Sequence, residues 1–259
     1  MENTYWLRQT DKPLFEDVLW SRPENKQRAG KLLIVGGNLH GFSAPGTAYN
    51  AAVKVGIGTA RVILPDKIQK TVGKSLPEAE FAPSSLSGSF SKEALAQILD
   101  SAQWADGVLL AGDFGKNSET AILLEKFVEK FDGQLTLSGD SVDYFLSNPI
   151  MALRRHNVIA SNFGLLQKLV KPALIKHVDD LMNLVGKLHE ITQNNKAKLI
   201  TYHQGHIIAA DSGQVSTTPS KEVNLVDIAA YASVWWLQQP QKPFEALVSA
   251  VFSYCSSAR

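Results

Sequence analysis

Two aspartates, Asp113 and Asp140, each follow a short apolar segment of the sequence and could act on a small molecule. A carboxylate in that position can accept a hydrogen bond from a substrate hydroxyl, take up a proton or help to hold a metal ion. The alternative is that each is a solvated turn residue, which caps the helix that follows. One such carboxylate is weak evidence for a ligand site, whereas two at the ends of neighbouring strands favour it.

Glycines follow the first apolar segment, in residues 36–41, and a stretch of small residues continues through Gly46. Glycines let the backbone approach a ligand closely and let N–H groups at the start of a helix face an anion. The same glycines could instead serve a tight turn from strand to helix that needs positive φ. The spacing matches neither G-x-G-x-x-G nor the Walker A pattern, so both interpretations stay open.

The other reactive residue types give weaker signals. His203 and His206 lack a third metal ligand nearby, and we expect a turn between two strands there. The lone cysteine, Cys255, excludes a disulfide within the chain and has no neighbouring base to activate its thiol. We therefore expect no metal site, and we expect Trp235 and Trp236 to pack in the core or at an oligomer interface.

Short apolar segments alternate with amphipathic ones, which predicts alternating strands and helices. The predicted strands span 31–37, 60–64, 107–110, 134–137, 157–160 and 198–201, followed by a hairpin over 206–215. The predicted helices span 15–19, 45–54, 91–101, 118–131, 165–170, 178–194, 223–237 and 243–256. Continuous apolar strands indicate an α/β three-layer sandwich with a mostly parallel central sheet. Such sheets bind ligands at the carboxyl ends of their strands.

Composition bounds the class of protein. The chain has 259 residues with a formal net charge of +1, which offers no electrostatic argument for nucleic acid or an anionic membrane as partner. Residues 1–11 lack the apolar run of a signal peptide, and no stretch reaches the length of a membrane span. We expect a cytoplasmic protein with a single domain over 1–259, in which residues 1–27 form an N-terminal extension packed on the rest.

Several segments, taken in order, resemble one known family. They are residues 31–37, then Pro45-Gly-Thr-Ala-Tyr-Asn-Ala-Ala52, then Val55-Gly-Ile-Gly58, then Leu76-Pro-Glu78, then Ala105–Thr120. This order is similar to that of the ADP- or ATP-dependent NAD(P)H-hydrate dehydratases, which have the ribokinase-like fold. The resemblance covers roughly residues 28–256. It implies a nucleotide-dependent lyase that repairs hydrated NAD(P)H, with ADP or ATP and its Mg²⁺ as cofactor, and it suggests a homo-oligomer.

The resemblance also implies roles for individual residues. Asp227 would be the catalytic residue, which assists removal of the hydroxyl group by phosphorylation followed by elimination. The residues implied for substrate binding are Gly37, Gly41, Pro45, Gly46, Glu78, Asp113 and Asn162. The residues implied for nucleotide binding are Asp140, Gly164, Asn224, Leu225 and Val226.

The sequence departs from the family pattern at several of these segments, which makes it a divergent member. In residues 160–165 only Gly164 matches the family's T-P-H-P-G-E, and the strand end of 138–141 keeps the second aspartate but not the first. The glycine loop that precedes the catalytic aspartate is replaced by Ser216–Asp227, which is shorter and contains no glycine. Those glycines would expose amides to phosphate, and loss of one such donor costs on the order of 100–1000-fold in rate.

Three functions therefore stay open at this stage. The chain could be an active dehydratase, a catalytically inactive relative that acts as a binding or structural protein, or a small-molecule kinase of the same fold. The kinase needs the same anion hole as the dehydratase, so the missing glycines weigh against both. Hydroxyl and ammonium donors of the 216–221 segment could replace the missing amides if that loop is rearranged.

Overall fold

The computed structural model describes residues 4–72, 76, 79–170, 180–194 and 197–257. The strands are β1 (Trp6–Arg8), β2 (Lys31–Gly36), β3 (Thr59–Pro65), β4 (Ala79–Ala82), β5 (Gly107–Gly112), β6 (Gln134–Ser138), β7 (Asn157–Asn162), β8 (Lys198–His203), β9 (His206–Asp211) and β10 (Gln214–Pro219). They form one sheet in the order β1-β10-β9-β8-β7-β6-β5-β2-β3-β4. Only β9 runs antiparallel to its neighbours, so the predicted mostly parallel sheet is confirmed.

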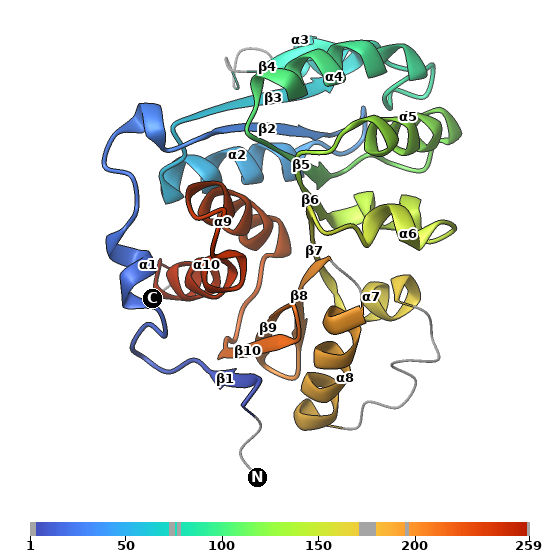
Figure 1. The fold of residues 1–259 in the computed structure, drawn as a ribbon. Helices are drawn as coiled ribbons and strands as arrows, with labels where there is room; N and C mark the ends of the chain where they lie inside the picture. The colour runs from blue at the N-terminus through green and yellow to red at the C-terminus, as the bar shows by residue number, and fades with distance from the viewer. Residues whose placement is uncertain (1–3, 73–75, 77–78, 171–179, 195–196, 258–259) are drawn as a thin grey trace.

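Helices cover both faces of this sheet, which confirms the predicted three layers (Figure 1). The α-helices are α1 (Glu16–Trp20), α2 (Ser43–Val55), α3 (Gln69–Val72), α4 (Leu95–Trp104), α5 (Ser118–Lys130), α6 (Pro149–Ala152), α7 (Phe163–Leu169), α8 (Leu181–Asn194), α9 (Leu225–Gln238) and α10 (Pro243–Ser257). Helices α2, α9 and α10 lie on one face, and α4 to α8 lie on the other (Figure 1).

Each face of the sheet buries its own apolar core because successive strand residues point to opposite faces. On β2, Leu33 and Val35 belong to the core under α4 and α5, whereas Leu32 and Ile34 belong to the core under α2 and α9. Helix α9 is apolar nearly all round because it packs between the sheet, α2 and α10. Its first turn is therefore held firmly beside the first half of α2.

The strands at the two edges of the sheet, β1 and β4, were not predicted from the sequence. Strand β1 has three residues and pairs in parallel with β10, and the four residues of β4 pair with β3. Strands this short carry too little alternation to be recognised from sequence. The turns at 204–205 and 212–213, which join β8 to β9 and β9 to β10, agree with the predicted hairpins.

The N-terminal segment lies against the C-terminal helices. Lys242 and Asp17 form an ion pair of 2.6 Å, and the guanidinium of Arg22 lies 4.4 Å from the ring centroid of Trp235. Arg22 Nε also donates to Gln238 Oε1 at 2.9 Å. The division into one domain with an extension over 1–27 remains a prediction.

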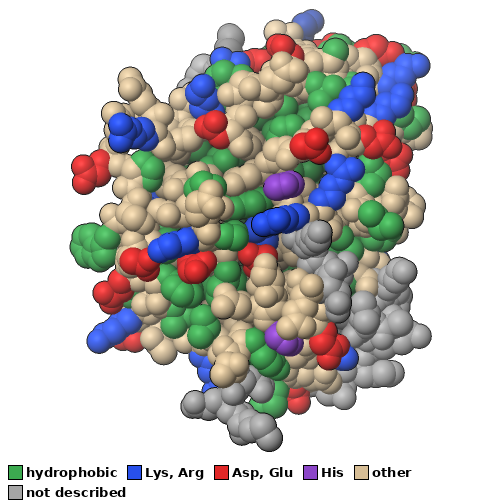
Figure 2. Space-filling model, in the orientation of Figure 1, with side chains coloured by type: hydrophobic (Ala, Val, Ile, Leu, Met, Phe, Trp, Pro, Cys, Tyr) green, Lys and Arg blue, Asp and Glu red, His purple; other side chains and the backbone are tan. Residues whose placement is uncertain are grey.

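The surface mixes charges of both signs. Lys and Arg side chains are interspersed with Asp and Glu over the face shown in Figure 2, in keeping with the net charge of +1. Within the described residues, no helix is long and apolar enough to cross a membrane.

Candidate functional site

Most of the site residues implied by the sequence lie at the carboxyl edge of the parallel strands. Gly37 and Gly41 follow β2, Asp113 follows β5, and Asp140 follows β6. Asn162 ends β7 and precedes α7. Glu78 lies outside the described residues. The edge is held together by hydrogen bonds between these loops, and in most of them a site residue is the acceptor.

Asp113 caps helix α2. Its Oδ2 accepts from the Ala44 N–H at 2.7 Å and from Ser43 Oγ at 3.2 Å. The backbone of Asp113 has φ of +60°, a left-handed conformation that aims the side chain at the start of α2. Gly41 lies beside it, since a Cβ on Gly41 would be 3.6 Å from Asp113 Cγ. The amide at the start of α2 is thus bonded to the chain's own carboxylate.

Asp140 is bonded in a similar way to the loop after β5. Its two carboxylate oxygens accept from the N–H groups of Phe114 and Gly115, at 3.1 and 3.0 Å. Burial raises the pKa of Asp140; the two N–H bonds oppose this rise, and the nearby Asp113 and Asp143 add to it. The carboxylate therefore fixes this loop with both of its oxygens.

Asn162 and Gly164 belong to the first turn of α7. Asn162 Oδ1 accepts from the Leu165 N–H at 2.8 Å, which makes it the N-cap of that helix. Within the described residues, no hydrogen bond joins either residue to the first turn of α9. Their predicted roles in ligand binding remain predictions, and so do those of the other implied residues.

The first turn of α9 is capped by Asn224. Its Oδ1 accepts from the N–H groups of Val226 and Asp227, at 3.0 and 3.3 Å. The Asn224 N–H in turn donates to the hydroxyl of Tyr254 at 2.9 Å. Amides at a helix start bind phosphate when they are free, but here a side chain of the chain itself is bonded to them. Two first-turn amides of α9 are therefore bonded within the chain.

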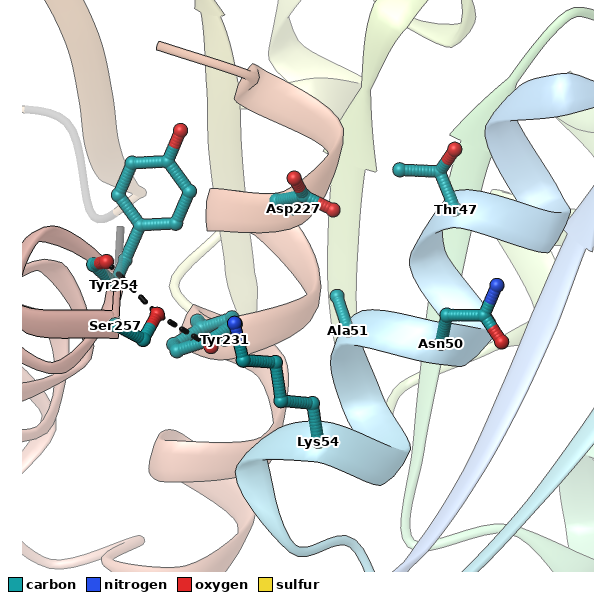
Figure 3. Close-up of a pocket in the computed structure, with 8 residues that line it drawn as sticks. All are labelled: Thr47, Asn50, Ala51, Lys54, Asp227, Tyr231, Tyr254 and Ser257. Atoms are coloured by element: carbon teal, nitrogen blue, oxygen red, sulfur yellow. Dashed lines mark hydrogen bonds between the residues drawn. The ribbon is translucent and has the colours of Figure 1, made fainter. Parts of the chain in front are cut away.

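Asp227 faces a cavity of about 360 Å³ between α2, α9 and α10 (Figure 3). The cavity is lined by Thr47, Asn50, Ala51 and Lys54 of α2, by Asp227 and Tyr231 of α9, and by Tyr254 and Ser257 of α10. The hydroxyls of Tyr231 and Ser257 lie 3.0 Å apart, and Ser257 Oγ donates to the Tyr254 carbonyl at 2.9 Å. One side of the cavity is thus a fixed polar wall.

The cavity contains one acidic side chain, Asp227, and one basic side chain, Lys54. Burial raises the pKa of Asp227, and the nearby positive charge of Lys54 opposes that rise. A carboxyl group with a raised pKa can exchange a proton closer to neutral pH. Asp227 and Lys54 together can hold a polar ligand that has both donor and acceptor groups.

The cavity includes residues that the sequence analysis did not single out. On α2, Thr47, Asn50 and Lys54 are spaced by three and four residues, which places them on one face of the helix. Asp227 and Tyr231 are likewise four apart on α9. The three- and four-residue spacing could have indicated which side chains share a helix face. That the two faces meet at one cavity depends on how α2 and α9 pack, which the sequence does not specify.

A further hollow of about 450 Å³ lies beside Asp140. Lys116, Asn117, Asp143 and Tyr144 contribute to its lining. Tyr144 donates its hydroxyl hydrogen to the Gly115 carbonyl, and burial raises the pKa of Tyr144 to about 12. Within the described residues, no group of three or more histidine, cysteine, aspartate or glutamate side chains is arranged to hold a metal ion.

The order of strands and the three layers together define a ribokinase-like α/β fold. This chain is similar in structure to a ribokinase-like superfamily protein from Enterococcus faecalis V583, with a TM-score of 0.76 and 15% identity. The superposition covers 99% of this chain and 88% of the other. The ADP/ATP-dependent NAD(P)H-hydrate dehydratase from Bacillus subtilis, co-crystallized with ATP and Mg²⁺, matches 96% of this chain over 90% of its own, with a TM-score of 0.64 and 13% identity.

The sequence comparison narrows the class further: the chain is a distant relative of the NAD(P)H-hydrate dehydratases. The bifunctional NAD(P)H-hydrate repair enzyme of Dictyoglomus turgidum is 25% identical over 139 residues. That match spans 52% of this chain and 27% of the curated relative. No protein-family model matches the chain. The predicted fold and resemblance are thereby confirmed.

Proposed function

We propose that the chain is a ligand-binding relative of the NAD(P)H-hydrate dehydratases that has lost nucleotide-dependent catalysis. The observation that carries this proposal is the pair of hydrogen bonds from the Val226 and Asp227 amides to Asn224. Phosphoryl transfer needs donors aimed at the phosphate oxygens, and these two are already bonded. Dehydratase and kinase chemistry both need that anion hole.

The proposed ligand site is the cavity that contains Asp227. Its walls offer a carboxylate, an ammonium and several hydroxyl and amide groups, on α9 and on the two helices that pack against it, α2 and α10. Such a site suits a polar molecule with several hydroxyl or amine groups. Nicotinamide nucleotides are the first probes to use, because the similar protein from Dictyoglomus turgidum is an NAD(P)H-hydrate repair enzyme.

A second candidate is a working ADP- or ATP-dependent dehydratase in which Asp227 is the acid or base. The raised pKa of Asp227 favours it, since a carboxyl group kept partly protonated is suited to proton transfer. This function requires that the Asn224 side chain rotate away so that phosphate can reach the amides of α9. An active dehydratase would also bind its ligand at Asp227, but it would consume hydrated NAD(P)H.

The deciding experiment measures binding and turnover separately. Thermal unfolding is followed with NADH, hydrated NADH, ADP and ATP, and each mixture is then assayed for loss of hydrated NADH. A ligand at 100 times its Kd stabilises the folded chain by about 2.7 kcal/mol. We expect a saturable shift with a nicotinamide nucleotide, abolished in Lys54→Met and Asp227→Asn, without turnover.

Lys70→Met is the matched control, because Lys70 is an exposed lysine of α3 outside the cavity. Hydrated NADH consumed in the presence of ADP or ATP, and no longer consumed by Asp227→Asn, would overturn the proposal in favour of the dehydratase. Transfer of a phosphoryl group from ATP to a small alcohol would favour the kinase. A chain that binds none of these nucleotides would refute the proposed ligand class.

A further inference from the structure

A separate cavity of about 360 Å³ lies at the opposite edge of the sheet from the loops that carry Asp113 and Asp140. Lys198 is the first residue of β8 and Asp211 is the last of the antiparallel β9, so both lie at the amino edge of the parallel strands. Arg155, which precedes β7, is the third charged residue of its lining, and Pro243, the first residue of α10, also lines it.

Lys198 is buried to an unusual degree for a lysine, with 4% of its surface exposed. Its Nζ donates to the Arg155 carbonyl at 2.8 Å and lies 4.1 Å from the ring centroid of Trp236. Neither contact supplies a negative charge. Burial lowers the pKa of Lys198, the nearby Asp211 opposes this change, and Arg155 adds to it.

The carboxylate in this cavity does not neutralise both cations. Asp211, also 4% exposed, lies one position beyond the Leu199–Ala210 pair and so stands opposite Lys198 across the two strands. Its Oδ1 accepts from Ser212 Oγ at 3.1 Å. Among the described residues, no carboxylate oxygen lies within 4.0 Å of a side-chain nitrogen of Lys198 or Arg155.

The balance of charge in the lining is therefore positive. Two cations face one carboxylate, and the 15-residue helix α10 begins at Pro243 in the lining, with the positive end of its dipole there. Burial of Lys198 without a carboxylate in ion-pair contact is costly, and an anion that enters the cavity would offset that cost with charge-assisted hydrogen bonds. The volume suffices for a small molecule or for the acidic end of a larger one.

We propose that this cavity binds an oxyanion, either a phosphate or a carboxylate group, between Lys198 and Arg155. The site is independent of the Asp227 cavity, because it is built on the other ends of the strands and shares no residue with it.

The test is thermal unfolding of the full chain in increasing inorganic phosphate, and separately in increasing acetate, at constant ionic strength set with sodium chloride. A saturable rise in Tm with either anion supports the site, and the anion that gives it identifies the acidic group. Arg155→Gln should weaken the apparent affinity by at least about tenfold, since a hydrogen bond to a charged group contributes about 1.5–3 kcal/mol. Arg155 is exposed, so this variant should fold normally.

Three comparisons complete the test. Arg28→Gln, an exposed arginine before β2, should leave the anion response unchanged, and so should Asp227→Asn. Lys198→Met should abolish the response while keeping the length of the buried side chain. No saturable rise with either anion, a rise unaffected by Arg155→Gln, or a rise lost in Asp227→Asn would each overturn the proposal.

Discussion

The side chain of Asn224 accepts a hydrogen bond from the backbone N–H of Asp227, at 3.3 Å, and a shorter one from Val226. The backbone N–H of Asp227, the predicted catalytic residue, is thereby part of a helix cap. Asparagine at this position stabilises α9 on its own, without a bound anion. The interaction that stabilises the helix also uses two of its first-turn amides.

Replacing Asn224 with glycine should separate these two effects. The free energy of unfolding should fall by only a few tenths of a kcal/mol, because glycine is a tolerated N-cap. The affinity for ADP should increase, because two amides and the positive end of α9 become available to phosphate. Urea denaturation and isothermal titration calorimetry measure the two quantities.

Asn25→Gly is the matched control. Asn25 is likewise an N-cap, because its side chain accepts from the Gln27 N–H at the start of the short helix Lys26–Arg28, before β2. It should lose a similar small amount of stability and gain no affinity for ADP. An unchanged ADP affinity in Asn224→Gly would mean that the cap is not what keeps phosphate away from α9.

Gly46 and Gly36 test whether the glycines near α2 serve a ligand or the fold. Nothing lies within 4 Å of a Cβ placed on Gly46, so Gly46→Ala within helix α2 should stabilise the chain by about 0.5–1 kcal/mol. A Cβ on Gly36 would lie 2.5 Å from the Gly112 carbonyl oxygen, so Gly36→Ala should destabilise it. Thermal unfolding distinguishes the two signs.

Gly46→Ala also tests ligand binding. If a ligand approaches the backbone at Gly46, as the family resemblance implies, Gly46→Ala will weaken binding although it stabilises the fold. If the glycine serves only the local backbone, the variant will bind any ligand found for the Asp227 cavity as tightly as the original chain.

The fold could be predicted because its signals are local. The apolar segment that becomes β2 and the small residues of α2 each specify their own structure, and the sheet follows from their alternation. The cavity around Asp227 could not be predicted in the same way. Lys54 and Tyr254 are distant in sequence, and they meet only because α2 and α10 both pack against α9.

Hydrogen-bond partners were the other feature beyond reach of the sequence. Asp113 was expected either to meet a ligand or to cap the next helix; it caps α2, which begins far away in sequence, and not α5. Its left-handed backbone makes that contact, and sequence alone gives no sign of the conformation. Asn117, four residues later, caps α5 instead.

Asp113 gives a prediction that separates capping from backbone strain. Asp113→Ala and Asp113→Gly both remove the acceptor for the Ala44 N–H, which should cost about 0.5–2 kcal/mol. Alanine should cost roughly 1 kcal/mol more than glycine, because only alanine is strained at a φ of +60°. Urea denaturation of both variants measures the difference, and equal stabilities would mean that the loop after β5 relaxes when the cap is lost.

The pH dependence of stability tests the environment of Asp227. Because burial raises the pKa of Asp227 above its ordinary value, the folded chain binds this proton more tightly than the unfolded chain. Stability from this group is therefore fully present below the pKa of an unfolded aspartate and is lost as the pH rises through the higher pKa of the folded chain. Asp227→Asn removes that loss, so the Tm of the variant relative to the original chain should increase from pH 3.5 to pH 7.

Lys54→Met should make the loss larger in a chain that keeps Asp227, because the positive charge that opposes the rise in pKa is gone. A Tm difference that does not change with pH would mean that Asp227 is as well solvated in the folded chain as in the unfolded one, and would leave it no role as a proton donor in this cavity.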